Sequence, residues 1–252
     1  MLAPPAGRQA GQLAETVTGP GGRRPGRIRV TARQDQRLSY RSRLAVYNRG
    51  MHVLPTQDEI IRILNDTGAL RGGHFELPNG MHTSQFLQLP LALRYYQHTR
   101  TFSVALSRLL RANPEISARI AELSVVTPAS GGLPLAFGVS EALRCHQVYW
   151  AENEGGRLRF RQYMEDHRGE LVVIVDDTLR TGRKIAELKT LLESQGATVL
   201  ALAVAIHQPR GPAVELDNLP LYTLARLDAE QYPDAAACRM CRAGEPVERI
   251  RA

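Results

Sequence analysis

Cysteine is scarce in this sequence, which holds three cysteines in 252 residues: Cys145, Cys238 and Cys241. So few thiols exclude a disulfide framework and fit a reducing compartment. Cys238 and Cys241 form a C-x-x-C motif, but a structural zinc site needs four ligands and the sequence has no second cysteine pair. We therefore interpret these two residues as incidental thiols near a C-terminal turn, and we assign no metal ligand.

Long apolar runs are absent as well. No segment has the length and hydropathy of a membrane span, and the N-terminal region lacks the apolar stretch of a secretory signal. We therefore expect a cytoplasmic protein with no membrane partner.

Acidic residues are nearly absent from residues 1–50, where ten arginines stand against only Glu15 and Asp35. The segment carries a net charge of +8. Because the whole chain carries +7, residues 51–252 carry a net charge of −1. Its Gly, Pro, Arg and Gln content predicts a disordered basic arm. We favour an arm without function; nucleic-acid contact, an organellar transit peptide and a true start at Met51 are the alternatives.

The hydrophobic content of 43% is enough for one α/β core, which we assign to residues 51–252. Segments typical of strands alternate with segments typical of helices; the main predicted strands are 123–126, 171–175 and 198–206. This alternation predicts an α/β fold with a mostly parallel sheet flanked by helices. Residues 72–80 alternate around an Asn-Gly turn and lead into residues 84–87, which predicts a small hairpin.

The most informative segment is 171–182, which reads LVVIVDDTLRTG. Its five leading apolar residues predict a buried strand, and residues 183–195 follow as a helix. Ligands of α/β sheets bind at such strand ends, where a helix N-terminus offers free N–H groups to a phosphate. Asp176 and Asp177 would accept hydrogen bonds from a ribose diol. The phosphate would lie on the turn from Thr178 to Gly182. The candidate substrate-binding residues of this segment are Thr178, Leu179, Arg180, Thr181, Gly182, Arg183 and Lys184.

A loop of small residues follows the predicted strand 123–126. Because it has no bulky side chain, backbone N–H groups can approach a pyrophosphate closely at Ala129, Ser130, Gly131 and Gly132. Glycine loops and Asp- or Thr-capped helices are common in plain turns. Here the glycine loop stands one crossover before the aspartate segment. This combination favours a joint site for a ribose phosphate and a pyrophosphate.

Three arginines follow Gly155-Gly156: Arg157, Arg159 and Arg161. In a strand they would share one face, and a mobile hairpin could bring them to a leaving pyrophosphate. We therefore name Arg159 and Arg161 as candidate catalytic residues beside the two aspartates. An exposed basic edge strand is the alternative.

Taken together, these segments resemble orotate phosphoribosyltransferases, which are type I phosphoribosyltransferases. The aspartate segment has the order of that group's phosphoribosyl pyrophosphate motif: an apolar strand, two acids, a short apolar and hydroxyl stretch, and Gly. Other segments match in order and spacing over residues 51–252: residues 73–80 with Phe86, 127–132, 151–156 and 232–244.

The resemblance implies a type I transferase core with a small hood made from the N-terminal segment, in a homodimer. It implies condensation of orotate with phosphoribosyl pyrophosphate to orotidine monophosphate and pyrophosphate, with Mg²⁺ as cofactor. Pyrophosphate esters bring Mg²⁺ largely through their own oxygens and water, so no carboxylate cage is needed. Phe75 and Phe86 become candidate hood residues against the base. No general base is assigned, and we interpret His74, His82 and His207 as packing or hydrogen-bonding residues.

Four residues depart from the family pattern. Asn153 and Leu89 stand at positions that are usually basic, and Arg180 stands where a threonine is usual. Gln208, a candidate substrate-binding residue, stands where an arginine normally meets orotate, so a bidentate charge-assisted pair is lost. We hypothesise that Arg180 replaces the missing cation. The alternatives are a transferase retuned to another base, and a non-catalytic phosphoribosyl pyrophosphate-binding regulator that uses its arm on nucleic acid.

Overall fold

The computed structural model describes residues 54–161, 167–211, 214–216 and 218–251. These residues belong to one compact unit. None of the helices in the described part of the chain is long and apolar enough to cross a membrane. The predicted basic arm of residues 1–50 lies outside the described residues, so its disorder stays a prediction.

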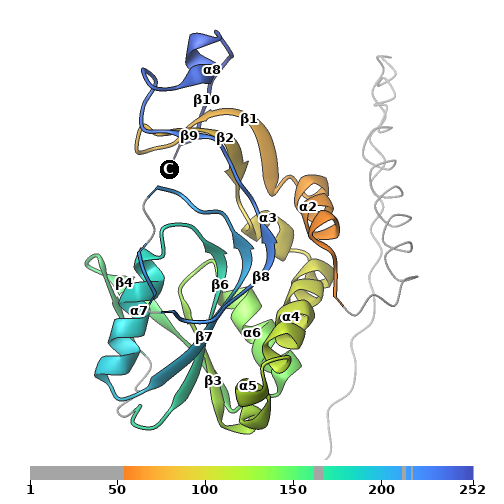
Figure 1. The fold of residues 1–252 in the computed structure, drawn as a ribbon, viewed down its shortest axis with the longest axis vertical. Helices are drawn as coiled ribbons and strands as arrows, with labels where there is room; N and C mark the ends of the chain where they lie inside the picture. Colours follow the sequence, from red (N-terminus) through yellow and green to blue (C-terminus); the bar gives the residue numbers. More distant parts are fainter. Residues whose placement is uncertain (1–53, 162–166, 212–213, 217, 252) are drawn as a thin grey trace, which may run out of the picture. The chain divides into compact units, whose positions relative to one another are not determined.

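Six strands form the main sheet in the order β5-β4-β3-β6-β7-β8 (Figure 1). They are β3 Leu123–Pro128, β4 Gln147–Glu154, β5 Arg157–Arg159, β6 Leu171–Leu179, β7 Thr198–His207 and β8 Leu221–Arg226. Every neighbouring pair is parallel except β4 and β5, which are antiparallel. The predicted mostly parallel α/β sheet is confirmed.

Helices cover both faces of this sheet. The sequence starts the first of them with a capping box, in which Thr56 and Glu59 each accept a hydrogen bond from the other's backbone N–H. One face packs into a single core with α2 Gln57–Asp66, α3 Pro90–Leu93, α4 Tyr96–Arg111, α5 Pro114–Ala118 and α6 Leu133–Leu143. The short helix η1 Ile120–Glu122 leads into β3. The other face packs against α7 Arg183–Ser194.

Strand β6 is buried on both faces because its apolar residues alternate between two cores. Val173 and Val175 belong to the core that includes α4 and α6, whereas Val172 and Ile174 belong to the core that includes α7. Successive side chains of a strand point to opposite faces, so an unbroken apolar run suits a strand covered on both sides. The strand therefore holds the residues at its carboxyl end in a fixed position.

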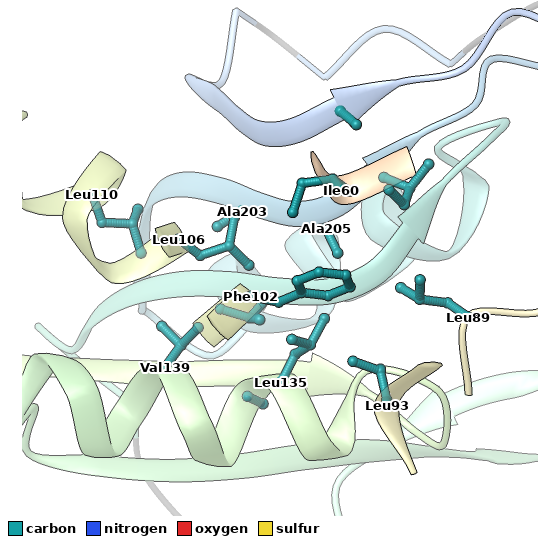
Figure 2. Close-up of a cluster of buried hydrophobic side chains, with 14 of the residues drawn as sticks. Ile60, Leu89, Leu93, Phe102, Leu106, Leu110, Leu135, Val139, Ala203 and Ala205 are labelled. Carbon is teal, nitrogen blue, oxygen red and sulfur yellow. The ribbon is translucent and has the colours of Figure 1, made fainter. Parts of the chain in front are cut away.

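The first core also holds the chain segment that follows strand β2. Phe102 of α4 is fully buried among Leu135 and Val139 of α6 (Figure 2). Leu89 and Leu93 belong to the same core, and in Figure 2 they lie on the side of Phe102 that is away from Val139. Burial of each such side chain stabilises the fold by about 1.5–3 kcal/mol. Leu89 thereby fixes the segment before α3 against the main domain.

A second, smaller sheet has the order β10-β1-β2-β9. It consists of β1 Leu70–Glu76, β2 His82–Leu87, β9 Gln231–Tyr232 and β10 Glu248–Arg249. β1 and β2 are antiparallel and turn at Gly80, which has φ +80°, so the predicted hairpin is confirmed. The sheet combines β1 and β2 with β9 and β10 from the C-terminal end of the chain, and the hood made from the N-terminal segment stays a prediction.

The smaller sheet also gives Cys238 and Cys241 two neighbours that the sequence did not suggest. The cysteines lie at the N-cap and within α8 Arg239–Arg242, and their sulfurs lie within 4.8 Å of ring nitrogens of His74 and His82. From the sequence, only a second cysteine pair was considered as partners for these thiols, whereas the neighbours are histidines, and His74 stands 164 residues before Cys238.

Candidate active site

The carboxyl ends of β3 and β6 open onto a cleft with a volume of about 480 Å³. This size is typical of pockets for small ligands. Its walls come from the loops after β3 and β6, the start of α7, and the segment that joins β2 to α3. The lining residues are Leu87, Gln88, Leu89, Pro90, Pro128, Ala129, Ser130, Gly131, Asp176, Asp177, Thr178, Leu179, Arg180, Thr181, Gly182, Arg183, Lys184 and Ile185.

The two predicted loops thus share one cleft. A further wall, formed by residues 87–90, was not among the predicted site residues. Only Leu89 in this segment was singled out from the sequence. Residues 87–90 include no charged side chain that would indicate a binding site. Gly132 is the N-cap residue of α6, directly behind the cleft-lining Gly131.

The small-residue loop lies so close to the aspartates that only glycine fits. A Cβ atom on Gly131 would lie 2.7 Å from Oδ2 of Asp177. A Cβ atom on Gly132 would collide with Oγ1 of Thr127 and lie 2.7 Å from Oδ1 of Asp176. Contacts this short do not occur at real Cβ atoms, so both glycines are required by the approach of the two loops.

The loop after β6 ends in an open helix N-terminus. Gly182 is the N-cap residue of α7, with φ +76°, and α7 has no side-chain cap. The first N–H groups of a helix have no partner within the helix and carry a partial positive charge. Lys184 lies in the same wall of the cleft. This end of the cleft is therefore suited to a phosphate.

The two aspartates are held in a state that disfavours their charges. Asp176 is 9% exposed, and burial raises its pKa well above the usual value; the charge of Asp177 adds to this and Lys184 opposes it. Burial also raises the pKa of Asp177, against opposing effects of the Thr178 backbone and of Arg180. Such carboxylates gain stability from hydroxyl donors or from a nearby cation.

Arg180 extends across the cleft wall toward the segment after β2. Its Nη2 donates a hydrogen bond of 3.0 Å to the carbonyl oxygen of Leu87. Burial lowers the pKa of the Arg180 guanidinium, while the charges of Asp177 and Asp176 oppose that shift. The side chain therefore crosses from the aspartate loop to the opposite wall.

A second arginine, Arg210, lies near Arg180 and was missed by the sequence analysis. Burial lowers the pKa of Arg210 to about 10, and the charge of Arg180 adds to the shift. Gln208 is fully buried, and its backbone N–H donates to the carbonyl oxygen of Leu179 at 2.9 Å. Within the described residues, the Nε atoms of Arg180 and Arg210 and the Nε2 atom of Gln208 have no hydrogen-bond partner. Buried donors without acceptors are unusual and indicate a place for an acceptor-rich ligand.

Phe75 and Phe86 lie in the smaller sheet and are not among the residues that line the described cleft. Their ring centroids are 5.8 Å apart, and the guanidinium of Arg71 lies 5.2 Å from each ring. Phe75 is buried. Their contact with a base therefore stays a prediction.

Arg159 and Arg161 also lie outside the described walls of the cleft. Arg159 is exposed on β5, the edge strand of the main sheet. Arg161 forms ion pairs with Glu152 at 3.3 Å and Glu154 at 3.7 Å. In the structure this segment is an exposed basic edge strand, and the approach of its arginines to a leaving group stays a prediction.

Comparison with known proteins identifies the family. The phosphoribosyl transferase domain family matches residues 105–219, which include both cleft loops. Orotate phosphoribosyltransferase of Thermotoga maritima is 31% identical over 191 residues, covering 75% of this chain and 96% of that protein. The enzyme of the same name from Pelotomaculum thermopropionicum is 33% identical over 195 residues, covering 76% of this chain and 95% of that protein.

The chain belongs to the orotate phosphoribosyltransferase family. Its fold agrees with the crystal structure of orotate phosphoribosyltransferase from Aeropyrum pernix, with a TM-score of 0.54 and 24% identity. That match covers 67% of this chain and 93% of the other.

Two of the residues that the sequence analysis reads as departures from the family pattern make clear local contacts. Asn153 accepts a hydrogen bond of 3.0 Å from the backbone N–H of Gly156 and so stabilises the turn between β4 and β5. Leu89 is 1% exposed and belongs to the main core. Both side chains therefore have structural roles in this chain.

Proposed function

We propose that this protein transfers the phosphoribosyl group of phosphoribosyl pyrophosphate to orotate, giving orotidine monophosphate and pyrophosphate in pyrimidine nucleotide synthesis. The observation that carries the proposal is the shared cleft, in which Gly131 lies against Asp177 and the open end of α7 forms the far wall. Each part suits one portion of the sugar donor. We take orotate as the acceptor because the curated relatives are named orotate phosphoribosyltransferase.

In this scheme the donor binds through three contacts. Asp176 and Asp177 accept hydrogen bonds from the ribose hydroxyls, which offsets the charge repulsion between them. The N–H groups at the start of α7 and the hydroxyls of Thr178 and Thr181 bind the 5-phosphate. The backbone around Ser130 binds the pyrophosphate, which leaves as positive charge develops on the ribose carbon.

The acceptor needs no general base, because a deprotonated ring nitrogen of the pyrimidine can attack the ribose carbon directly. The protein then has to align the two reactants and exclude water from the cleft. For this reason no histidine is assigned a part in the reaction.

We propose that Arg180 and Arg210 recognise the carboxylate of orotate. The family resemblance implies an arginine at the position of Gln208, so the cation has to come from another residue. Arg180 and Arg210 have unpartnered Nε donors, and the amide nitrogen of Gln208 is a third. A carboxylate would satisfy buried guanidinium donors and offset the repulsion between the two arginines. The sequence pointed to Arg180 alone, and the unpartnered Nε of Arg210 supports its inclusion in the proposal.

Mg²⁺ fits the chemistry of this cleft. Asp176 and Asp177 are carboxylates whose pKa values are raised by burial, and oxygen ligands are what this ion prefers. We propose that Asp176 and Asp177 would hold the ion together with oxygens of the pyrophosphate group. When bound, it supplies positive charge that stabilises the departing pyrophosphate.

We further propose a cytoplasmic homodimer, in line with the family resemblance. Light scattering on the purified chain tests the dimer. The arm of residues 1–50 has no part in the proposed reaction.

The deciding experiment mixes the purified chain with Mg²⁺, phosphoribosyl pyrophosphate and one base at a time, and follows pyrophosphate release. We expect turnover with orotate and none with uracil, adenine, guanine or hypoxanthine. Turnover with a base other than orotate would favour the retuned transferase. Binding of phosphoribosyl pyrophosphate without turnover of any base would favour the non-catalytic regulator.

A further inference from the structure

Four side chains with metal-binding atoms converge in the smaller sheet, and none of them lines the described cleft. They are His74 on β1, His82 on β2, and Cys238 and Cys241 at α8. One ligand atom from each lies within 4.8 Å of all the others. Three of the four residues are buried, and Cys241 is partly buried.

Three of the distances between these atoms match the nitrogen–sulfur edges of a tetrahedral zinc site. Nε2 of His74 lies 3.5 Å from both sulfurs, and Nδ1 of His82 lies 3.5 Å from the sulfur of Cys241. With Zn–S bonds of about 2.3 Å and Zn–N bonds of about 2.0 Å, the nitrogen–sulfur edge of a tetrahedron is about 3.5 Å. The two ring nitrogens are 2.8 Å apart, so zinc would move them apart by roughly 0.5 Å to reach tetrahedral geometry.

The tautomer of His74 also suits a metal. Its Nδ1 lies 3.0 Å from the carbonyl oxygen of Glu245, which can only accept a hydrogen bond. Nδ1 therefore carries the proton, and Nε2 presents a lone pair to the two sulfurs. Metal-binding histidines commonly donate their other N–H to a carbonyl in this way, which fixes the ring orientation.

Charge and chain geometry support the same conclusion. Zn²⁺ with two thiolates and two neutral imidazoles has no net charge, so it can be buried without an unpaired ion. The strands β9 and β10 are two residues long and α8 is four residues long. Elements this short bury little apolar surface and commonly need a crosslink or a metal to hold them.

We propose that His74, His82, Cys238 and Cys241 bind a structural Zn²⁺ ion. Two nitrogens and two thiolate sulfurs are a frequent ligand set of structural zinc, and four protein ligands leave no open position for catalysis. The ion fastens α8, with the chain on either side of it, to the β1–β2 hairpin. This site does not depend on the proposed transferase activity.

The test measures metal in the full chain, purified in a reducing buffer without chelator from cells grown with added zinc. Elemental mass spectrometry should find about one zinc per chain. After exchange, Co²⁺ should give the visible absorption of a tetrahedral site with thiolate ligands. Zinc far below one per chain together with no such cobalt spectrum would overturn the proposal, as would a Cys238–Cys241 disulfide in the freshly purified protein.

Variants locate the metal. The double variant Cys238→Ser and Cys241→Ser should lose zinc and the cobalt spectrum, whereas Cys145→Ser should keep both, since Cys145 contacts Ser140 and Gln147 instead. A double variant that keeps its zinc would overturn the site. Should the double variant fold poorly, His82→Cys offers a second readout. It should keep zinc and strengthen the thiolate-to-cobalt absorption, and an unchanged cobalt spectrum would contradict ligation by His82.

Discussion

The backbone N–H of Asp177 donates a hydrogen bond of 2.8 Å to Oδ1 of Asp176. Both carboxylates line the same cleft, and burial raises the pKa of each. The ligand-free site thus holds two acidic groups whose ionised forms are disfavoured. Hydroxyl groups of a bound sugar would relieve this, so affinity for the donor comes at a cost to the stability of the free protein.

Replacing the more buried aspartate should separate stability from activity. The raised pKa of Asp176 means that the folded protein loses stability as the pH rises from the unfolded value of 3.8 toward the folded value. Asp176→Asn replaces the buried acid with a neutral amide. At neutral pH, Tm should therefore rise by about 2–4 °C for each kcal/mol of unfavourable charge burial that the substitution removes. Activity should fall by about 100-fold or more. Thermal melts measure the stability and pyrophosphate assays measure the activity. The exposed Asp58→Asn is the control. A lower Tm of Asp176→Asn at pH 7.5 would contradict a stability cost of the buried Asp176 charge.

The close approach of the two loops predicts a strong effect of a single methyl group. Gly131→Ala places a Cβ atom 2.7 Å from Oδ2 of Asp177 and should displace that carboxylate. The KM for phosphoribosyl pyrophosphate should rise by about tenfold or more, since small displacements in a binding site are costly. Gly72→Ala is the matched control, because its Cβ atom meets nothing within 4 Å. Equal kinetics for the two variants would refute a steric origin of the defect.

Acceptor recognition by the arginine pair predicts a selective defect. Arg180→Ala and Arg210→Ala should each raise the KM for orotate by about 10- to 100-fold, the value of a hydrogen bond to a charged group. The KM for phosphoribosyl pyrophosphate should change far less. Steady-state kinetics with each substrate varied in turn provide the measurement. Equal losses for both substrates would show that these arginines serve the donor or the fold.

A buried network around Glu170 anchors the chain where strand β6 begins. The Glu170 carboxylate is 2.7 Å from Nε2 of Gln147, 3.0 Å from the hydroxyl of Tyr149 and 2.5 Å from Nδ1 of His167. Burial alone raises the pKa of Glu170, but hydrogen bonds from Ser124 and these three side chains outweigh it and hold the pKa below its usual value.

The network predicts a pH-dependent contribution to stability. A lowered folded pKa gives stability that is present above the unfolded value of 4.5 and is lost as the pH falls through the folded value. Glu170→Gln should therefore cost about 2 kcal/mol of unfolding free energy at pH 7, with a smaller cost near pH 3. Urea unfolding across this range measures it. The exposed Glu141→Gln should show no such trend, and a cost independent of pH would assign the loss to packing alone.

Local sequence was enough to predict the centre of the site. The strand, the turn and the helix from Leu171 to Ser194 are contiguous, and an unbroken apolar run followed by Asp176 and Asp177 is typical of a buried strand that ends at a binding site. The loop at Ser130 could be joined to it because parallel strands place their carboxyl ends at one edge of a sheet.

The features that were missed depend on contacts between distant parts of the chain. Arg210 follows β7 without a motif of its own, and only the fold brings it beside Arg180. The histidines of the smaller sheet and the cysteines of α8 meet because β1 pairs with β10 and β2 pairs with β9. Neither pairing leaves a periodic signal, since β9 and β10 are too short to show alternation.

The two-sided burial of β6 has a consequence for how acceptor preference can change in this scaffold. Val172 and Val173 face different cores, so both cores hold in place the carboxylates of Asp176 and Asp177, which we propose bind the sugar. Positions 180 and 208 lie beyond the ends of strands β6 and β7. Substitutions at these two positions should therefore change which base is accepted and leave donor binding intact. Directed evolution toward new nucleobases would start at positions 180 and 208.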